Sequence, residues 1–176
     1  MRDTITRRSL IAGSAALAAA VPATSAPAGG DPIFAAIERH KAAMVVYIAT
    51  YRDGSDLEES LPRDRKRSRI FGSMPSDDDV IVATDDPRWI ASERAYFVAS
   101  EAADELAMAL LEIRPTSVAG AAALLRYATE YVDDGHLWPV CAEPAEPAKD
   151  WSFLLQRMLA GALEKIAATG GQAVQS

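Results

Sequence analysis

Acidic residues lie close together on one predicted helix, and their spacing could serve a metal ion. Glu101 and Glu105 are four residues apart with Asp104 between them, so their carboxylates share one side of a helix. Carboxylate oxygens are ligands for hard cations. Di-metal sites in helical bundles, however, take Glu-x-x-His pairs, and neither His40 nor His136 follows a glutamate at that spacing. We therefore favour a solvated acidic face and predict no metal or cofactor here.

A histidine and the single cysteine lie five residues apart in one predicted loop. His136 and Cys141 are both of a type that binds zinc, but a structural zinc takes about four ligands and the chain has no second cysteine. A lone cysteine forms no intramolecular disulfide. It could join two copies of the chain in an oxidising compartment, so a homodimer stays open. Burial of Cys141 as a small apolar side chain is the simplest interpretation.

His40 falls on the apolar stripe of the first predicted helix, between Ile37 and Met44. This position favours a core histidine with one hydrogen bond over a catalytic base. The sequence also lacks a Gly-x-Ser-x-Gly elbow, a phosphate loop and a dinucleotide fingerprint. It therefore assigns no catalytic residue.

A basic run stands between the first two predicted helices and has five members: Arg63, Arg65, Lys66, Arg67 and Arg69. In a cytosolic protein such a run is typical of an arm that contacts phosphates. Three aspartates, Asp77–Asp79, follow within ten residues and could neutralise the run by folding back. A solvated loop is the favoured interpretation, and the alternative is a docking patch for an acidic partner or an anionic membrane surface.

Seven aromatic residues could line a ligand pocket between the helices. Such side chains more often fill the core of a bundle and its ends, and we expect this for most of them. The seven are Trp89, Trp138, Trp151, Tyr47, Tyr51, Phe97 and Tyr127, of which Trp138 is the exception because it stands in a loop.

Four predicted helices must position these side chains. Asp31-Pro32 places an N-cap before a first-turn proline, and the helix that follows ends at Asp53-Gly54 or one turn later, within 56–59. Asp86-Pro87 repeats the start signal, and Pro115 ends the second helix.

The third helix begins at Thr116 or Ser117 and ends at Asp134-Gly135. Its short link to the second helix predicts an antiparallel hairpin of the two. Its apolar face is predicted to include Val118, Ala121, Leu125, Ala128 and Val132. The fourth helix begins at Asp150 and ends before Gly170-Gly171.

The fold class that follows is all-α, a small antiparallel helical bundle of about four helices. Residues 29–176 form its single domain, with a long charged insertion at 61–86 and a Pro-rich crossover at 136–149. Val80–Thr84 could form a short strand, but the sequence offers it no partner. A hydrophobic content of 49% and a charged content of 24% fit a globular chain.

The N-terminal 28 residues read as an export leader. Thr6-Arg7-Arg8-Ser9-Leu10-Ile11 has the order of a twin-arginine signal, and the uncharged stretch 9–21 is about 20 Å long as a helix. That is too short to span a bilayer. The small-x-small rule places cleavage after Ala28 or after Ala23. The alternative is an N-terminal amphipathic helix that stays attached.

Charge separates the leader from the body. The whole chain has a formal charge of −7, and residues 29–176 hold 15 basic and 24 acidic residues, a charge of −9. An acidic body argues against general nucleic-acid binding, which needs basic surface. No apolar run reaches the ~20 residues of a membrane span.

The segment Arg114–Tyr127 (RPTSVAGAAALLRY) resembles a group of small uncharacterised helical proteins of alphaproteobacteria. The similarity extends to DPIFAAIERHKAA, LEESLP, ATDDPRWIASERA and the LWP…W…LL pattern at 137–139 and 151–155. The resemblance implies a helical body behind a twin-arginine-type leader, and it implies no catalytic residue, substrate or cofactor.

Together these features predict an exported, soluble helical protein in the periplasm or outside the cell. Its expected partners are the twin-arginine translocation machinery, through Arg7 and Arg8, and an unidentified ligand or envelope protein. One alternative is a metal- or cofactor-carrying accessory protein or enzyme of the envelope. The other is a cytosolic nucleic-acid-associated protein that uses 63–69.

Overall fold

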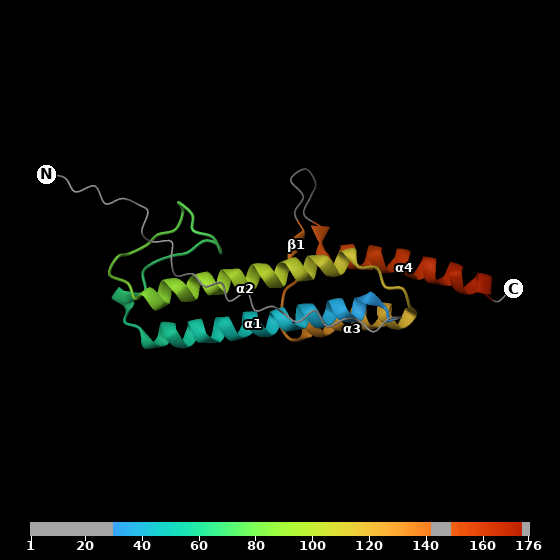
Figure 1. Ribbon diagram of the computed structural model, residues 1–176, viewed down its shortest axis with the longest axis horizontal. Coiled ribbons are helices and arrows are strands. Elements are labelled where there is room, and N and C mark those ends of the chain that lie inside the picture. The colour runs from blue at the N-terminus through green and yellow to red at the C-terminus, as the bar shows by residue number, and fades with distance from the viewer. Residues whose placement is uncertain (1–29, 142–148, 174–176) are drawn as a thin grey trace.

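Helices dominate the computed structural model, which describes residues 30–141 and 149–173. In these ranges lie α1 (Pro32–Ser60), α2 (Pro87–Glu112), α3 (Val118–Asp133) and α4 (Trp151–Ala173), with a short 3-10 turn η1 (Arg63–Arg65) (Figure 1). The two-residue strands β1 (Val140–Cys141) and β2 (Lys149–Asp150) pair antiparallel in the crossover. The predicted all-α bundle is confirmed. The predicted leader and its cleavage positions lie outside the described residues.

Side-chain caps explain where the helices begin. Asp31 Oδ1 accepts from the Ile33 amide at 3.1 Å and Asp86 Oδ1 from the Arg88 amide at 2.9 Å, each ahead of a proline. Ser117 Oγ accepts from the Gly120 amide at 3.0 Å. Asp150 Oδ1 accepts from the Ser152 amide at 2.9 Å. The four predicted starts are therefore confirmed, because short polar side chains satisfy amides that have no partner inside the helix.

The first helix ends close to the later of its two predicted ends, and the predicted end of the fourth helix is wrong. The first helix passes through Gly54 and ends at Ser60, as its alternative reading allowed, and α4 passes through Gly170 and Gly171 to Ala173. A glycine ends a helix when it adopts positive φ, and among the described residues only Gly135 does so, just after α3. Gly54 serves packing instead, since a Cβ there would lie 3.1 Å from Ser92 Oγ on α2.

The helices form a long hairpin that is covered at one end. Helices α1 and α2 run antiparallel along their whole length, and α3 and α4 lie only over the end that holds the start of α1 (Figure 1). Helix α3 packs against α1 and α4, and α4 packs against α2. As predicted, α2 and α3 run antiparallel and are joined by a short link (Figure 1). Asp31, just before α1, holds this link through the amides of Thr116 and Ser117.

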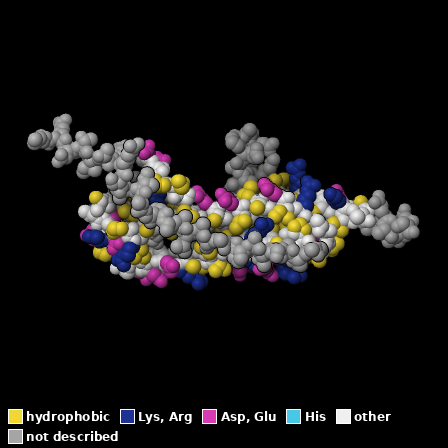
Figure 2. All heavy atoms as spheres, in the orientation of Figure 1, with side chains coloured by type: hydrophobic (Ala, Val, Ile, Leu, Met, Phe, Trp, Pro, Cys, Tyr) yellow, Lys and Arg dark blue, Asp and Glu magenta, His cyan; other side chains and the backbone are white. Residues whose placement is uncertain are grey.

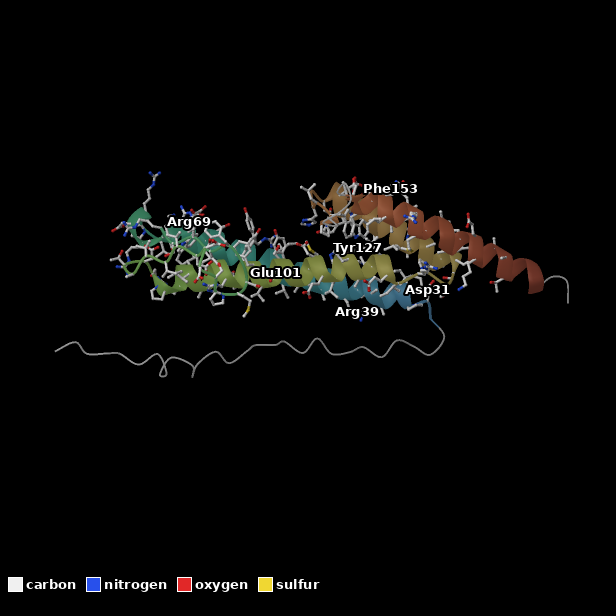
Figure 3. All side chains as sticks on the ribbon, turned by 90° about the horizontal axis from the view of Figure 1, so that it is seen from above. Asp31, Arg39, Arg69, Glu101, Tyr127 and Phe153 are labelled. Atoms are coloured by element: carbon white, nitrogen blue, oxygen red, sulfur yellow. The ribbon has the colours of Figure 1, made fainter. Side chains whose placement is uncertain are left out.

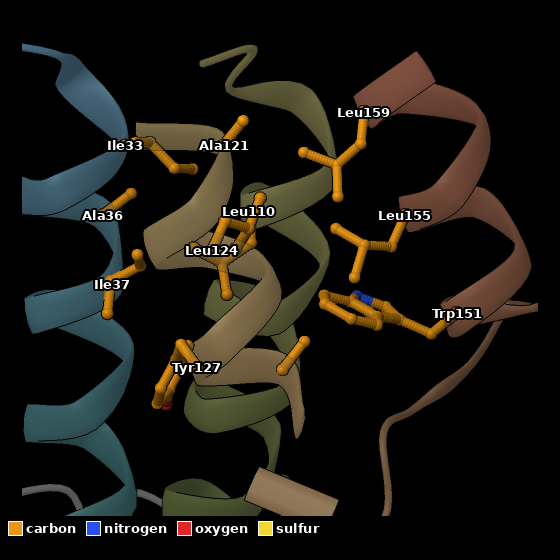
Figure 4. Close-up of a cluster of buried hydrophobic side chains, with 11 residues drawn as sticks. Ile33, Ala36, Ile37, Leu110, Ala121, Leu124, Tyr127, Trp151, Leu155 and Leu159 are labelled. Atoms are coloured by element: carbon orange, nitrogen blue, oxygen red, sulfur yellow. The ribbon is translucent and has the colours of Figure 1, made fainter. Parts of the chain in front are cut away.

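The main core fills the four-helix end (Figure 4). Ile33, Leu110 and Leu124 are fully buried there and meet Trp151 of α4. The predicted apolar face of α3 is only partly right. Ala121 and Ala128 are buried, but Val118, Leu125 and Val132 are half or more exposed, and the buried face instead carries Leu124, Tyr127 and Tyr131.

The insertion 61–86 folds over the two-helix end. Val80 pairs with Arg69 through two backbone hydrogen bonds of 2.9 Å, which supplies the strand partner that the sequence left open. The buried Asp85 carboxylate accepts from the amides of Arg67 and Ser68. The Trp89 indole N–H donates to the backbone carbonyl of Ser68 at 3.2 Å. Figure 3 shows how far Arg69, in the insertion, lies from Asp31 at the four-helix end.

No helix within residues 30–141 and 149–173 combines the length and the apolar character that crossing a membrane requires. On the face drawn in Figure 2, charged side chains lie mainly around the edges and apolar ones gather between them.

Candidate functional site

His40 lies at the centre of an aromatic cluster and is fully buried. Its Nδ1 shares a 2.6 Å hydrogen bond with the Tyr127 hydroxyl, while Nε2 has no hydrogen-bond partner within residues 30–141 and 149–173. The Tyr127, Tyr131 and Trp138 rings surround the imidazole at centroid distances of 5.7, 5.5 and 5.4 Å. The interpretation of His40 as a core histidine with one hydrogen bond is confirmed.

Burial determines the charge state of His40. Removal from water, helped by the positive potential of the nearby His136, lowers the pKa of His40 to about 4. The imidazole is therefore neutral at physiological pH. Because water and solutes do not reach it, His40 holds the core together rather than transferring protons to a ligand.

Two stacked indoles attach the crossover to this cluster. The rings of Trp138 and Trp151 lie 3.8 Å apart at an angle of 6°. Trp138 donates to the Ala128 carbonyl at 3.3 Å, and Trp151 donates to the Ala107 carbonyl at 2.9 Å. Trp138, which the sequence left open because it lies in a loop, is thus a packing residue.

A hollow of about 280 Å³ opens where α3 ends against the longer α1–α2 hairpin. We call it the step hollow. Buried side chains form its floor and exposed residues of the α3–β1 link stand at its rim. Its lining residues are Met44, Tyr47, Ser100, Ala103, Asp104, Tyr131, Gly135, His136 and Leu137. This volume is at the lower end of ligand pockets, so the hollow suits a small molecule.

The turn at Gly135 shapes one wall of the step hollow. Gly135 has a φ of 86°, and its amide donates to the Val132 carbonyl while the next amide donates to the Tyr131 carbonyl. The reversed chain brings the His136 ring to 4.9 Å from the Tyr131 ring. Tyr131 also donates to Met44 Sδ at 3.5 Å, so α1, α3 and the link meet here.

Asp104 gives the step hollow a negative rim. No described lysine, arginine or histidine forms an ion pair with its carboxylate. Partial burial, followed by the charge of Glu101, raises the pKa of Asp104. The carboxylate also contributes to the raised pKa of Tyr131, after burial, and to that of Tyr47, which a hydrogen bond to Tyr96 raises to about 12. The negative charge of Asp104 therefore acts on the phenols of both Tyr47 and Tyr131.

The other predicted site residues lie apart from one another. Among the described side chains, no group of three or more His, Cys, Asp and Glu residues could hold a metal ion. His136 lines the step hollow, whereas the side chain of Cys141 is outside the described part of the chain. Glu101 and Glu105 are exposed on α2.

The basic run is not neutralised as the sequence suggested. Arg67 faces Asp85 at 3.8 Å and Lys66 faces Glu58 at 3.7 Å. Asp79 instead pairs with Arg94 of α2 and accepts from the amides of Phe71 and Ser76, so the aspartate run closes its own turn. The segment 77–79 does fold back, since Val80 pairs with Arg69, but among the described residues none of its aspartates forms an ion pair with the basic run.

A second, smaller hollow of about 140 Å³ lies between α1 and α2. Tyr51 and Trp89, two of the seven predicted aromatics, line it together with Tyr96. Tyr47 belongs to the step hollow and its hydroxyl lies 3.2 Å from that of Tyr96.

Sequence reasoning missed Tyr131, the residue that joins the core to the step hollow. Its signal was present, because Leu124, Tyr127 and Tyr131 recur at helical spacing and define a face. The role of Asp104 in a pocket was missed as well, because the sequence groups Asp104 with Glu101 and Glu105 on one helix face.

Comparison with known proteins gives no relative: no family model, no curated protein and no solved structure matches the chain. The resemblance to alphaproteobacterial proteins therefore stays a prediction.

Proposed function

We propose that this protein acts outside the cytoplasm as a small binding module and that its ligand occupies the step hollow. The observation that carries the proposal is the composition of this hollow. Two phenols, an imidazole and a thioether line a space of about 280 Å³ beside a carboxylate for which the described part of the chain provides no ion-pair partner. Apolar walls with a few polar groups are the general pattern of ligand sites.

The position of the step hollow also favours binding over catalysis. Its floor is made by side chains that belong to the packed core, such as Met44 and Tyr131, and so its shape is formed before a ligand arrives. A preformed site spends little free energy on ordering its own side chains. Asp104 and His136, the titratable groups nearest its mouth, lie on different elements and share no hydrogen bond among the described contacts.

Support for export comes from the sequence. Arg7 and Arg8 precede an uncharged stretch and small residues that suit cleavage after Ala28 or Ala23. A twin-arginine substrate folds before it is transported, and a capped helical domain meets that requirement.

Cell fractionation with N-terminal sequencing tests the export part. We expect the mature chain outside the cytoplasm, beginning after Ala28 or Ala23, and we expect exchange of Arg7 and Arg8 for lysine to retain it inside. A full-length cytoplasmic chain would reject this part. Binding is tested separately by ligand-observed NMR with a library of small molecules, in which hits must shift the signals of Tyr131 and His136.

The two alternatives draw no support from residues 30–141 and 149–173. A metal-carrying accessory protein or enzyme needs a ligand cluster, and a nucleic-acid-associated protein needs free basic side chains. In the described structure Arg67 and Lys66 each face an acid, whereas Arg63, Arg65 and Arg69 form no ion pair there. The −9 charge of residues 29–176 opposes an approach of nucleic acid. Elemental analysis and a salt titration of nucleic-acid binding address them directly.

A further inference from the structure

We infer that the step hollow selects small organic cations, with Asp104 as the counter-ion and the ring of Tyr47 as the aromatic wall. This inference rests on the proposed function and names the ligand class of the same site. A cation attached to an apolar body would meet in this hollow both a carboxylate and the electron-rich faces that attract positive charge.

Asp104 is the charged side chain that a cation would meet in the step hollow. Its carboxylate has no ion-pair partner among the described residues, and Glu101 on the same helix adds negative potential. Asp104 is exposed at the rim of the hollow, and an unpaired carboxylate is stabilised by a cation that is held beside it. An anionic ligand would instead meet repulsion from both acids.

Tyr47 of α1 and Tyr131 of α3 line the hollow together with Met44. The Tyr131 ring is only 8% exposed and is covered by the His136 and Trp138 rings, at centroid distances of 4.9 and 4.0 Å, so Tyr47 is the ring that a cation can meet. Such walls accept methyl or methylene groups, and an aromatic ring attracts a cation that is held over its face. A hydrated metal ion gains nothing from apolar and aromatic walls, and the residues that line the hollow include only one carboxylate, that of Asp104.

The formal charge of −7 on the whole chain attracts cations to the surface, yet it does so everywhere and selects no site. Selection has to come from the combination of Asp104 with the Tyr47 ring. A control variant must therefore remove a negative charge from a residue outside the step hollow.

The test uses a pair of probes that differ in charge alone. Choline and its neutral isostere 3,3-dimethyl-1-butanol are titrated into the purified full-length protein at constant ionic strength, with backbone NMR signals as the readout. We expect choline to shift signals of residues lining the step hollow and to bind at least tenfold more tightly than the alcohol. Sodium chloride at matched concentration must leave these signals unchanged.

Two matched variants locate the counter-ion. Asp104→Asn should weaken choline about tenfold and leave the alcohol unaffected, whereas Glu105→Gln, which removes the same charge one residue further along α2, should change neither. Equal effects of the two variants would show attraction by net charge alone and overturn the inference. Thermal unfolding of both variants checks that they remain folded.

A second pair keeps the test decisive if Asp104→Asn perturbs the helix. Tyr47→Phe retains the ring and should retain most choline affinity, while Tyr47→Leu should lose several-fold. Equal binding of choline and the alcohol in the step hollow would reject the cation class and keep the small-ligand function. Absence of shifts with both probes would reject the cation class, and a library screen that is also silent at Tyr131 and His136 would reject the function itself.

Discussion

The Asp31 carboxylate lies 2.8 Å from the Ser117 hydroxyl and thereby joins the starts of α1 and α3. One oxygen caps α1, and the other accepts from the Ser117 hydroxyl and from the amides of Thr116 and Ser117. Burial alone would raise the pKa of Asp31, but the hydrogen bonds from Ser117, Ile33 and Thr116 outweigh it and lower the pKa. One side chain therefore fixes two helix ends and the path of the link between α2 and α3.

Replacement of Asp31 should cost more than the loss of an ordinary cap. We expect Asp31→Ala to lower the free energy of unfolding by about 2 to 3 kcal/mol, because the cap of α1 is lost and the Ser117 amide loses its acceptor. Asp150→Ala, which removes only the cap of α4, should cost about 1 kcal/mol. Urea unfolding compares the two, and equal losses would contradict a double role.

Gly120 is required by this junction. A Cβ at position 120 would lie 2.0 Å from Asp31 Oδ2 and 2.9 Å from Ile33 Cγ2, so Gly120→Ala must displace the carboxylate. We expect a loss of about 2 to 3 kcal/mol. Gly161 has open space around it within α4, so Gly161→Ala should gain up to about 1 kcal/mol. Thermal melts of the two variants should therefore shift in opposite directions.

His40 should make the fold sensitive to acid. The pKa of His40 is lowered to about 4 in the folded state, against about 6.5 when unfolded, so its contribution to stability is complete above pH 6.5 and declines toward pH 4. The loss reaches about 3 kcal/mol at pH 4. The phenols of Tyr127 and Tyr131, which face the ring, stay neutral over this range, since burial raises the pKa of each.

Variants separate this effect from the titration of carboxylates. His40→Phe should have a flatter stability curve than the wild type between pH 6.5 and pH 4. Tyr127→Phe removes the hydrogen bond to His40 but keeps the titrating ring, so it should lower the whole curve and preserve its slope. Parallel curves for the wild type and His40→Phe would show that His40 does not govern the acid response.

Asp85 should control the insertion without controlling the bundle. Its carboxylate binds two consecutive amides of the basic run, at Arg67 and Ser68. In Asp85→Ala these amides lose their acceptor, and we expect trypsin to cleave within 63–69 much faster while the helical circular dichroism is unchanged. Asp78→Ala, at an exposed position in the same insertion, is the control. Equal cleavage of the two variants would contradict this role.

The helix starts could be predicted from the sequence because capping is local. Asp31, Asp86, Ser117 and Asp150 act within three residues of their own positions. The ends of α1 and α4 could not, since a glycine stops a helix only if tertiary structure lets it take positive φ. Gly135 does so and Gly54 does not.

Non-local arrangements escaped prediction for a related reason. Helix α3 is rich in alanine, so two overlapping faces are apolar, and the large rings of Tyr127 and Tyr131 rather than Leu125 and Val132 turn inward. The second hydrogen-bonding role of Asp31 spans 86 positions in the sequence and leaves no local mark. The step hollow likewise depends on where α3 stops along α1, which hydrophobic spacing does not encode.

The unequal cover of the long hairpin has a consequence for amide hydrogen exchange. The parts of α1 and α2 beneath α3 and α4 share the main core, whereas the parts beyond Tyr47 and before Ser100 rest on each other and on the insertion. Each long helix should therefore contain a slowly exchanging segment and a faster one. The step hollow lies at the boundary between them, so a bound ligand should slow exchange in the uncovered segments and make the hairpin open as a single unit.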